Sequence, residues 1–220
     1  MALDVKICGL KSEEAVDAAV ESGARFVGFV FFPGSPRAVT APRAAQLAAI
    51  VPSGVIKVGL FVDADDAMLA ATLRVAKLDL LQLHGRETSK RVAAIKARFG
   101  IPVMKVIAVA EASDLDRVGA YEAVADRLLF DARPPEGATR PGGLARTFDW
   151  TLLRGRKFQV PWLLAGGLTV DALEEAVLAS GASAVDVSSG VEEREGVKSP
   201  AMIRAFMDRA RTLNPTADSA

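Results

Sequence analysis

Two side chains that can exchange protons stand at the ends of short apolar segments. Cys8 ends the segment 3–8, and Asp131 ends the segment 127–131. A thiol can act as a general base when its pKa is lowered, and Lys6 or a bound polar substrate could lower it. A carboxyl group after an apolar run must be hydrogen-bonded or neutral, and a neutral carboxyl can donate a proton. The two residues are therefore suited to acid–base chemistry.

Both residues also have an interpretation without chemistry. A lone cysteine near the end of a strand is usually a small buried hydrophobic residue. As a nucleophile, Cys8 would need an activating histidine, and the sequence contains only His84. Asp131 could simply cap the chain or pair with Arg133. The sequence pattern alone leaves these alternatives open.

Other polar residues follow later apolar segments and predict a phosphate site. Gly166-Gly167 and Ser188-Ser189 can bring backbone N–H groups close to an anion. Because barrels often hold phosphate after strands seven and eight, we expect a phosphorylated small-molecule substrate there.

Three further residues each have two interpretations. Arg37 could clamp a carboxylate through two hydrogen bonds or form a surface ion pair. Asp186 could bond substrate hydroxyl groups or buried backbone. His84 is more typical of a structural histidine than of a ligand, and one histidine cannot form a two-histidine metal site, so no metal is expected.

The segments that must position these residues alternate between β-branched or aromatic runs and Ala-, Leu- and Glu-rich stretches of helical period. Strands are predicted at residues 3–8, 25–31, 55–62, 78–83, 102–107, 127–131, 160–165 and 184–188. Helices are predicted at residues 12–22, 41–51, 65–76, 88–99, 112–121, 149–154, 170–180 and 199–213. Most helices follow a capping residue or proline, namely Ser12, Pro42, Asp65, Ser113, Thr169, and Ser199 with Pro200.

Eight strands that are each followed by a helix predict an α/β fold, a single-domain (β/α)8 TIM barrel over residues 1–213. An open doubly wound sheet is the alternative, because no residue reports closure directly. The active site of such a barrel lies at the carboxyl ends of the strands, where Cys8 and Asp131 would both face the open end of the barrel. The Gly- and Pro-rich loop 132–148 after strand six is expected to be functional, and residues 214–220 to be a disordered tail.

Composition excludes several classes of partner. The 220 residues carry 27 Lys and Arg against 27 Asp and Glu, so no overall field favours nucleic acid or an anionic membrane. One cysteine cannot form an internal disulfide, which favours a reducing compartment, the cytoplasm by default. No apolar run has the pattern of a signal peptide or a membrane span.

Six motifs in order along the chain resemble those of the phosphoribosylanthranilate isomerase family. They are Lys6-Ile7-Cys8-Gly9; Gly28-Phe29-Val30-Phe31 leading to Ser35-Pro36-Arg37; Gln82-Leu83-His84-Gly85; Gly142-Gly143 before Phe148-Asp149-Trp150; Leu164-Ala165-Gly166-Gly167-Leu168; and Asp186-Val187-Ser188-Ser189-Gly190-Val191-Glu192. The resemblance covers essentially the whole chain. It implies a barrel enzyme of tryptophan biosynthesis that carries out an Amadori rearrangement of a phosphoribosyl anthranilate, with no cofactor.

The resemblance also implies roles for single residues. Cys8 would remove the C2′ proton of the sugar, and Asp131 would protonate the furanose ring oxygen. Arg37 would face the anthranilate carboxylate and Asp186 the sugar hydroxyls. The phosphate would contact Gly166, Gly167, Ser188 and Ser189. The enzyme would be a monomer or homodimer.

The sequence departs from the family pattern at two places, and two other functions compete with the one that the resemblance implies. Leu144-Ala145 stand where the family usually has a small polar residue and Gly, so loop six, the loop 132–148 after strand six, could take a different path. Residues 195–199 depart from the usual run before the last helix. One alternative is another barrel enzyme that acts on a phosphosugar. It could be a Schiff-base lyase or aldolase that uses Lys105 or Lys57, or an isomerase of histidine biosynthesis, in which Asp would be expected at position 8. The other is a non-catalytic barrel that binds a phosphorylated ligand.

Overall fold

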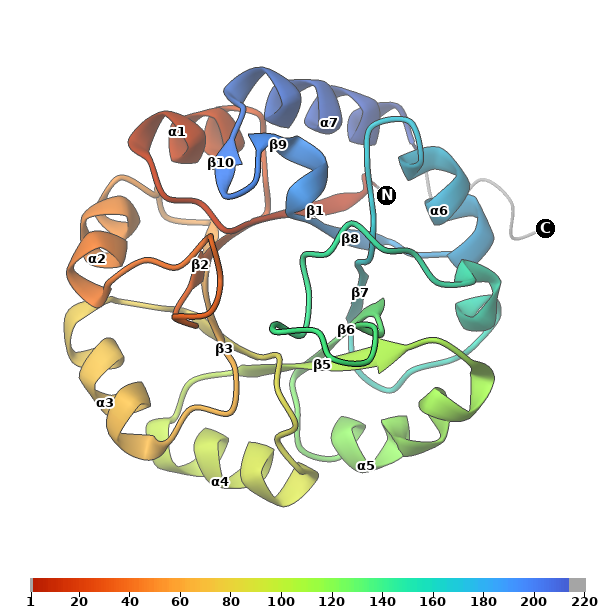
Figure 1. Ribbon diagram of the computed structural model, residues 1–220, viewed down its shortest axis with the longest axis horizontal. Helices are drawn as coiled ribbons and strands as arrows, with labels where there is room; N and C mark the ends of the chain where they lie inside the picture. Colours follow the sequence, from red (N-terminus) through yellow and green to blue (C-terminus); the bar gives the residue numbers. More distant parts are fainter. Residues whose placement is uncertain (1, 214–220) are drawn as a thin grey trace.

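The chain closes into a barrel of eight parallel strands ringed by helices (Figure 1). The computed structural model describes residues 2–213. The strands are β1 (Asp4–Cys8), β2 (Phe26–Val30), β3 (Ile56–Phe61), β4 (Leu80–Leu83), β5 (Val103–Val109), β6 (Arg127–Ala132), β7 (Trp162–Leu164) and β8 (Ala184–Val187). β1 pairs in parallel with both β2 and β8, so the barrel has no free edge. The predicted closed barrel is confirmed over the open sheet, and the predicted tail 214–220 lies outside the described residues.

The outer ring follows the capping signals of the sequence closely. The α-helices are α1 (Glu13–Glu21), α2 (Ala41–Ala49), α3 (Asp66–Val75), α4 (Ser89–Phe99), α5 (Val118–Glu122), α6 (Leu173–Ser180) and α7 (Pro200–Thr212). Ser12, Asp65 and Ser199 each cap a helix by accepting a hydrogen bond from a first-turn N–H. Pro42 lies in the first turn of α2 behind the cap Thr40. These side chains fix where the helices begin.

Two helix predictions need correction. The predicted helix 149–154 is only a 3-10 turn, η2 (Trp150–Leu153), because Gly155 takes a left-handed φ of +69° and stops it within one turn. The predicted helix 112–121 begins as the 3-10 segment η1 (Ala112–Arg117). Its cap is Glu111 with a reciprocal bond to Asp114, not Ser113. Thr169 caps a turn ahead of α6 rather than the helix itself, accepting from the Ala172 N–H.

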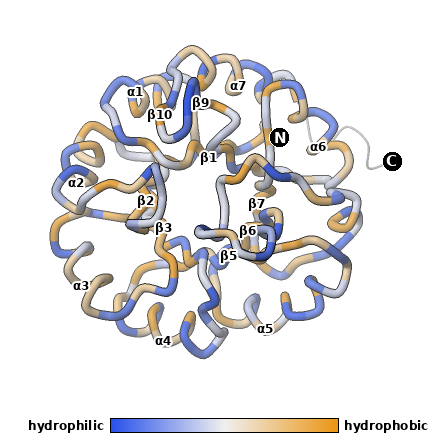
Figure 2. Tube along the Cα trace, viewed as in Figure 1, coloured by the Kyte–Doolittle hydropathy of each residue, from blue (hydrophilic) through white to orange (hydrophobic). Residues whose placement is uncertain are grey.

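Side chains alternate between two buried layers. Phe26, Val58, Leu80, Met104 and Leu129 belong to the cluster inside the barrel. Alternate strand residues, such as Ile7 beside Lys6, pack instead in the layer beneath the helices. Figure 2 shows the helices alternating between hydrophobic and hydrophilic residues, as one buried and one exposed face require. Within residues 2–213, no helix is long and apolar enough to cross a membrane.

A short antiparallel hairpin that the strand prediction missed follows β8. Its strands are β9 (Glu192–Arg194) and β10 (Val197–Lys198), and it comes after the 3-10 turn η3 (Ser189–Val191). The unusual sequence at 195–199 forms this hairpin and ends at the Ser199 cap of α7. The departure from the family pattern therefore leaves the start of the last helix intact.

Gly190 lets the segments after β7 and β8 touch, because a Cβ there would collide with the carbonyl oxygen of Leu168. We expect Gly190→Ala to lower the free energy of unfolding by roughly 1–3 kcal/mol, the usual range for overpacking. Gly119→Ala is the matched control, since a Cβ at this position in α5 meets no atom within 4 Å and alanine favours helix. Urea denaturation measures both. Equal stability of the two variants would contradict the close approach.

Candidate active site

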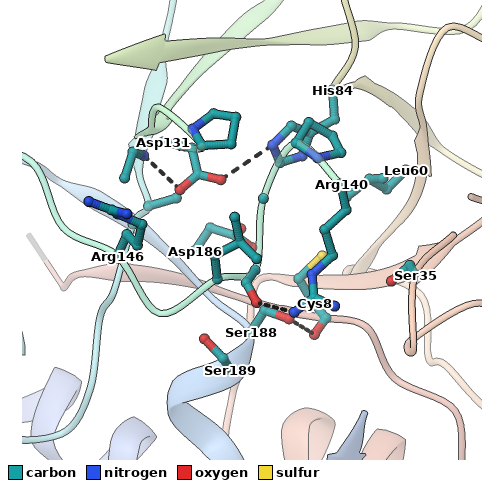
Figure 3. Close-up of a pocket in the computed structure, with 18 of the residues that line it drawn as sticks. Cys8, Ser35, Leu60, His84, Asp131, Arg140, Arg146, Asp186, Ser188 and Ser189 are labelled. Atoms are coloured by element: carbon teal, nitrogen blue, oxygen red, sulfur yellow. Dashed lines mark hydrogen bonds and ion pairs between the residues drawn. The ribbon is translucent and has the colours of Figure 1, made fainter. Parts of the chain in front are cut away.

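The eight residues expected to bind or transform a substrate all line one cavity at the carboxyl ends of the strands. They are Cys8, Arg37, Asp131, Gly166, Gly167, Asp186, Ser188 and Ser189. Figure 3 shows Asp131 and His84 on one side of this cavity, with Cys8 and Ser188 on another. The loop between β6 and η2 crosses the mouth of the barrel (Figure 1). Barrel closure thus gathers into one site residues that are spread along the whole sequence.

Cys8 faces the barrel interior above a buried ion pair. Lys6 is fully buried, and its Nζ lies 2.8 Å from Asp186 Oδ1. Burial raises the pKa of the Cys8 thiol above its ordinary value, although the Lys6 ammonium acts to lower it. Burial would lower the pKa of Lys6, but the charges of Asp186 and Cys8 raise it, so Lys6 stays an ammonium. Of the two sources considered for a lowered thiol pKa, Lys6 acts in that direction but is outweighed by desolvation.

Asp131 is the penultimate residue of β6, and its buried carboxyl group has His84 as a neighbour. Its Oδ1 accepts a hydrogen bond from the Ala132 N–H at 2.8 Å. Its Oδ2 lies 3.3 Å from His84 Nε2, but this contact does not have the alignment of a hydrogen bond. Arg133, the partner considered from sequence, instead contacts Asp114 outside the cavity. His84, interpreted as structural, therefore lies beside the candidate acid.

Loop six lies directly over this pair through Gly142. A Cβ at Gly142 would come within 2.7 Å of both Asp131 Oδ2 and His84 Cε1. Only a residue without a side chain allows the backbone to approach so closely. Leu144 and Ala145 also line the cavity. Ala145 takes a left-handed φ of +53°, which explains why Gly is usual at this position in the family pattern.

Arg37 is held by a buried carboxylate that the sequence did not mark as functional. Its Nε and Nη2 donate to the two oxygens of Glu192 at 2.7 and 2.8 Å, and Nη1 donates to the Gly143 carbonyl at 3.3 Å. The surface ion pair considered for Arg37 is therefore wrong, since the guanidinium is buried. Burial would raise the pKa of Glu192, but Arg37 and Lys198 lower it to about 2. The guanidinium is thus fixed in direction at the wall of the cavity.

The ends of β7 and β8 present backbone N–H groups beside a buried cation. Gly166 and Gly167 take left-handed φ values of +91° and +67°. In the described part of the chain, neither amide donates a hydrogen bond to another backbone group. Ser188 Oγ donates to the Cys8 carbonyl at 3.1 Å, and Lys198 Nζ donates to the Ser188 carbonyl at 3.0 Å. Sequence reasoning missed Lys198, because a single lysine after a strand carries no motif.

The alternative Schiff-base lysines lie elsewhere. Lys105 donates to Glu87 Oε2 at 2.7 Å and to two carbonyl groups of the 83–85 turn. Lys57 Nζ pairs with Asp79 at 3.1 Å. Neither lysine lines the cavity that holds Cys8 and Asp131. Among residues 2–213, no group of three or more His, Cys, Asp or Glu side chains could hold a metal ion.

Comparison with known sequences gives one consistent family. The family model described as N-(5'phosphoribosyl)anthranilate (PRA) isomerase matches residues 5–209. A relative from Paramagnetospirillum magneticum named N-(5'-phosphoribosyl)anthranilate isomerase is 58% identical over 215 residues, covering 98% of this chain and 100% of the relative. One of the same name from Paracoccus denitrificans is 58% identical over 210 residues, covering 96% and 98%.

Solved structures agree with the sequence relatives. Phosphoribosyl anthranilate isomerase from Thermotoga maritima superposes with a TM-score of 0.85 at 34% identity, covering 96% of this chain and 100% of that one. Phosphoribosyl anthranilate isomerase in complex with reduced 1-(o-carboxyphenylamino)-1-deoxyribulose 5-phosphate gives 0.80 at 32% identity, with the same coverage.

The burial of Cys8 leads to a direct titration. Because desolvation disfavours the charged thiolate, we expect the thiol to titrate above the ordinary value of about 8.5. Thiolate absorbance, taken as the difference between the wild type and Cys8→Ala, isolates the only cysteine. A midpoint below the ordinary value would show that Lys6 outweighs burial.

The left-handed conformation of Ala145 predicts a stabilising substitution. Ala145→Gly should raise the free energy of unfolding by about 1 kcal/mol, because the left-handed region is unfavourable for any residue with a Cβ. Ala138→Gly in the same loop, where φ is not positive, should not stabilise and serves as the control. Thermal denaturation of both variants checks this. No gain at position 145 would argue against the conformation described.

Proposed function

The chain belongs to the N-(5'-phosphoribosyl)anthranilate isomerase family, and from that premise we propose that Cys8 is the general base and Asp131 the general acid of its reaction. The enzyme isomerises N-(5-phospho-β-D-ribosyl)anthranilate to 1-(2-carboxyphenylamino)-1-deoxy-D-ribulose 5-phosphate in tryptophan biosynthesis. The observation that carries the assignment is that a thiol from β1 and a carboxyl group from β6 line the same cavity.

Proton transfers between these two groups and the sugar balance the reaction. Asp131 gives its proton to the ring oxygen as the bond from C1′ to that oxygen breaks, and the nitrogen lone pair forms a C1′=N bond. Cys8 takes the proton from C2′, the C–H electron pair forms C1′=C2′, and the π pair of the C1′=N bond returns to nitrogen. The resulting enol becomes the ketone by losing its hydroxyl proton while C1′ gains one. No electrons leave the substrate, so the isomerisation requires no redox cofactor, and positioned acid and base groups can each contribute about 10²–10⁴-fold.

Substrate would lie between the two ends of the cavity. The free N–H groups of Gly166 and Gly167, with Ser188 and Ser189, suit the phosphate, and buried Lys198 adds positive charge nearby. Arg37 would face the anthranilate carboxylate with the edge that Glu192 leaves free. Asp186 would accept from sugar hydroxyls while it holds Lys6. The relative bound to a reduced product analogue supports a phosphorylated ligand of this class.

The single cysteine and a dimeric relative bear on the compartment and the assembly. We place the enzyme in the cytoplasm, where a reducing environment keeps the single thiol available as a base. A relative from Thermotoga maritima is described as dimeric, and this chain is proposed to be a monomer or homodimer. Light scattering decides between the two states.

Removing either proton-transfer group should stop turnover while the fold remains. We expect Cys8→Ala to abolish measurable isomerisation and Asp131→Asn to lower kcat by about 10²–10⁴-fold. Product formation is followed in a purified system without added nucleotide or metal. Asp116→Asn, an exposed carboxyl group in η1, is the matched control and should keep wild-type activity. Near-normal turnover in Cys8→Ala or Asp131→Asn would refute that residue's role.

A further inference from the structure

Gln82 is a buried amide directly behind the imidazole that faces the acid. It lies in β4, fully buried inside the barrel, and its Nε2 is 3.3 Å from His84 Nδ1. Its Oε1 has no hydrogen-bond partner in the described part of the chain. A buried polar group that forms only one contact requires an explanation, because an unpaired carbonyl oxygen is unfavourable away from water.

Counting donors and acceptors assigns the proton on His84. A neutral imidazole has one N–H donor and one nitrogen acceptor, and an amide nitrogen can only donate. With Gln82 Nε2 against Nδ1, the Nδ1 atom accepts, so the proton sits on Nε2. The Nε2 side faces Asp131 Oδ2 at 3.3 Å, and an ionised carboxylate can only accept, so this tautomer suits the carboxylate that remains once Asp131 has given up its proton. We infer that Gln82 is a positioning residue that holds His84 in the tautomer whose Nε2–H faces Asp131.

The reversed amide gives a poorer arrangement. It would place Oε1 against Nδ1 and require a proton there. Once Asp131 has delivered its proton, a neutral imidazole would then direct a lone pair at the carboxylate, and two acceptors at 3.3 Å repel each other. In the observed orientation, Gln82 donates to His84, and the N–H of His84 faces Asp131. The Ala132 N–H is the other donor to the Asp131 carboxyl group.

This arrangement matters when Asp131 has delivered its proton, a consequence that depends on the function proposed above. The carboxylate left behind needs a donor, and a small tilt of the His84 ring brings Nε2–H into line. Catalytic hydrogen bonds commonly tighten in this way when substrate binds. The Gly142 backbone lies against the pair, whose side chains are only 10% and 11% exposed, and the low local dielectric strengthens the interaction.

The tautomer can be observed directly because the sequence contains one histidine. Protein labelled with ¹⁵N-histidine and prepared without a histidine tag gives only the two His84 ring nitrogens. We expect a protonated Nε2 and an unprotonated Nδ1 in the wild type. Gln82→Met, similar in size but unable to donate, should shift the signals towards a mixture of tautomers. Met104→Leu, a volume-conserving change at the β5 position paired with Gln82, should leave them unchanged.

Two spectroscopic results would overturn the inference. One is a wild-type His84 protonated on Nδ1, alone or together with Nε2. The other is a Gln82→Met variant that keeps the wild-type tautomer. Neither result depends on whether Asp131 is the acid, so failure of the tautomer assignment and failure of the proposed function are distinguishable. The same spectra report whether each variant is folded.

Kinetics separate positioning from packing. Gln82→Met should lower kcat by about 10–100-fold, the usual effect of losing a partner that orients a functional imidazole, with KM changed less than about twofold. In a His84→Ala background, the same substitution should have no further effect, since no imidazole remains to be positioned. Met104→Leu should keep its small effect in both backgrounds. Equal losses from Gln82→Met with and without His84 would show a packing role and contradict the inference.

Discussion

The pairing of β1 with β8 is the constraint on which the site depends. It closes the barrel and sets Lys6 beside Asp186 in register, although 180 residues separate them along the chain. The same register brings Ser188 Oγ to the Cys8 carbonyl, so the expected phosphate end and the thiol share one strand pair. Without closure, β1 would be a sheet edge, and its thiol would have neither the buried ammonium nor the opposing β6 carboxyl group.

Buried charges give the site its rigidity and set the thiol chemistry. Lys6 pairs with Asp186, and Glu192 pairs with both Arg37 and Lys198. These ion pairs are largely withdrawn from water, and removing one partner of such a pair typically destabilises a protein by about 3–5 kcal/mol. The ammonium beneath Cys8 opposes the effect of burial on its pKa, so the thiolate remains reachable within an apolar wall. The Glu192 carboxyl group, with a pKa of about 2, holds Arg37 as an anchor at all ordinary pH values.

The barrel and the residues that point into it could be predicted from the sequence, because strand alternation and helix caps are local signals. Cys8 and Asp131 could be placed at strand ends, and closure of the barrel brings both to the same cavity. The roles of Glu192 and Lys198 could not be predicted, since they depend on a hairpin whose fold is set by tertiary contacts. The position of His84 beside Asp131 could not be predicted, because the two residues come from different strands. The helix predicted at 149–154 was wrong because Gly155, with its left-handed φ, ends the segment within one turn.

The central claim is that the Cys8 sulfur removes the proton from C2′ of the sugar. Substrate carrying deuterium at C2′ tests it directly, with release of deuterium to solvent followed by NMR. The wild-type enzyme should release the label during turnover, at a rate slowed by a primary isotope effect, and Cys8→Ala should retain the label fully. Release of the label by Cys8→Ala at a rate near that of the wild type would show that Cys8 is not the base.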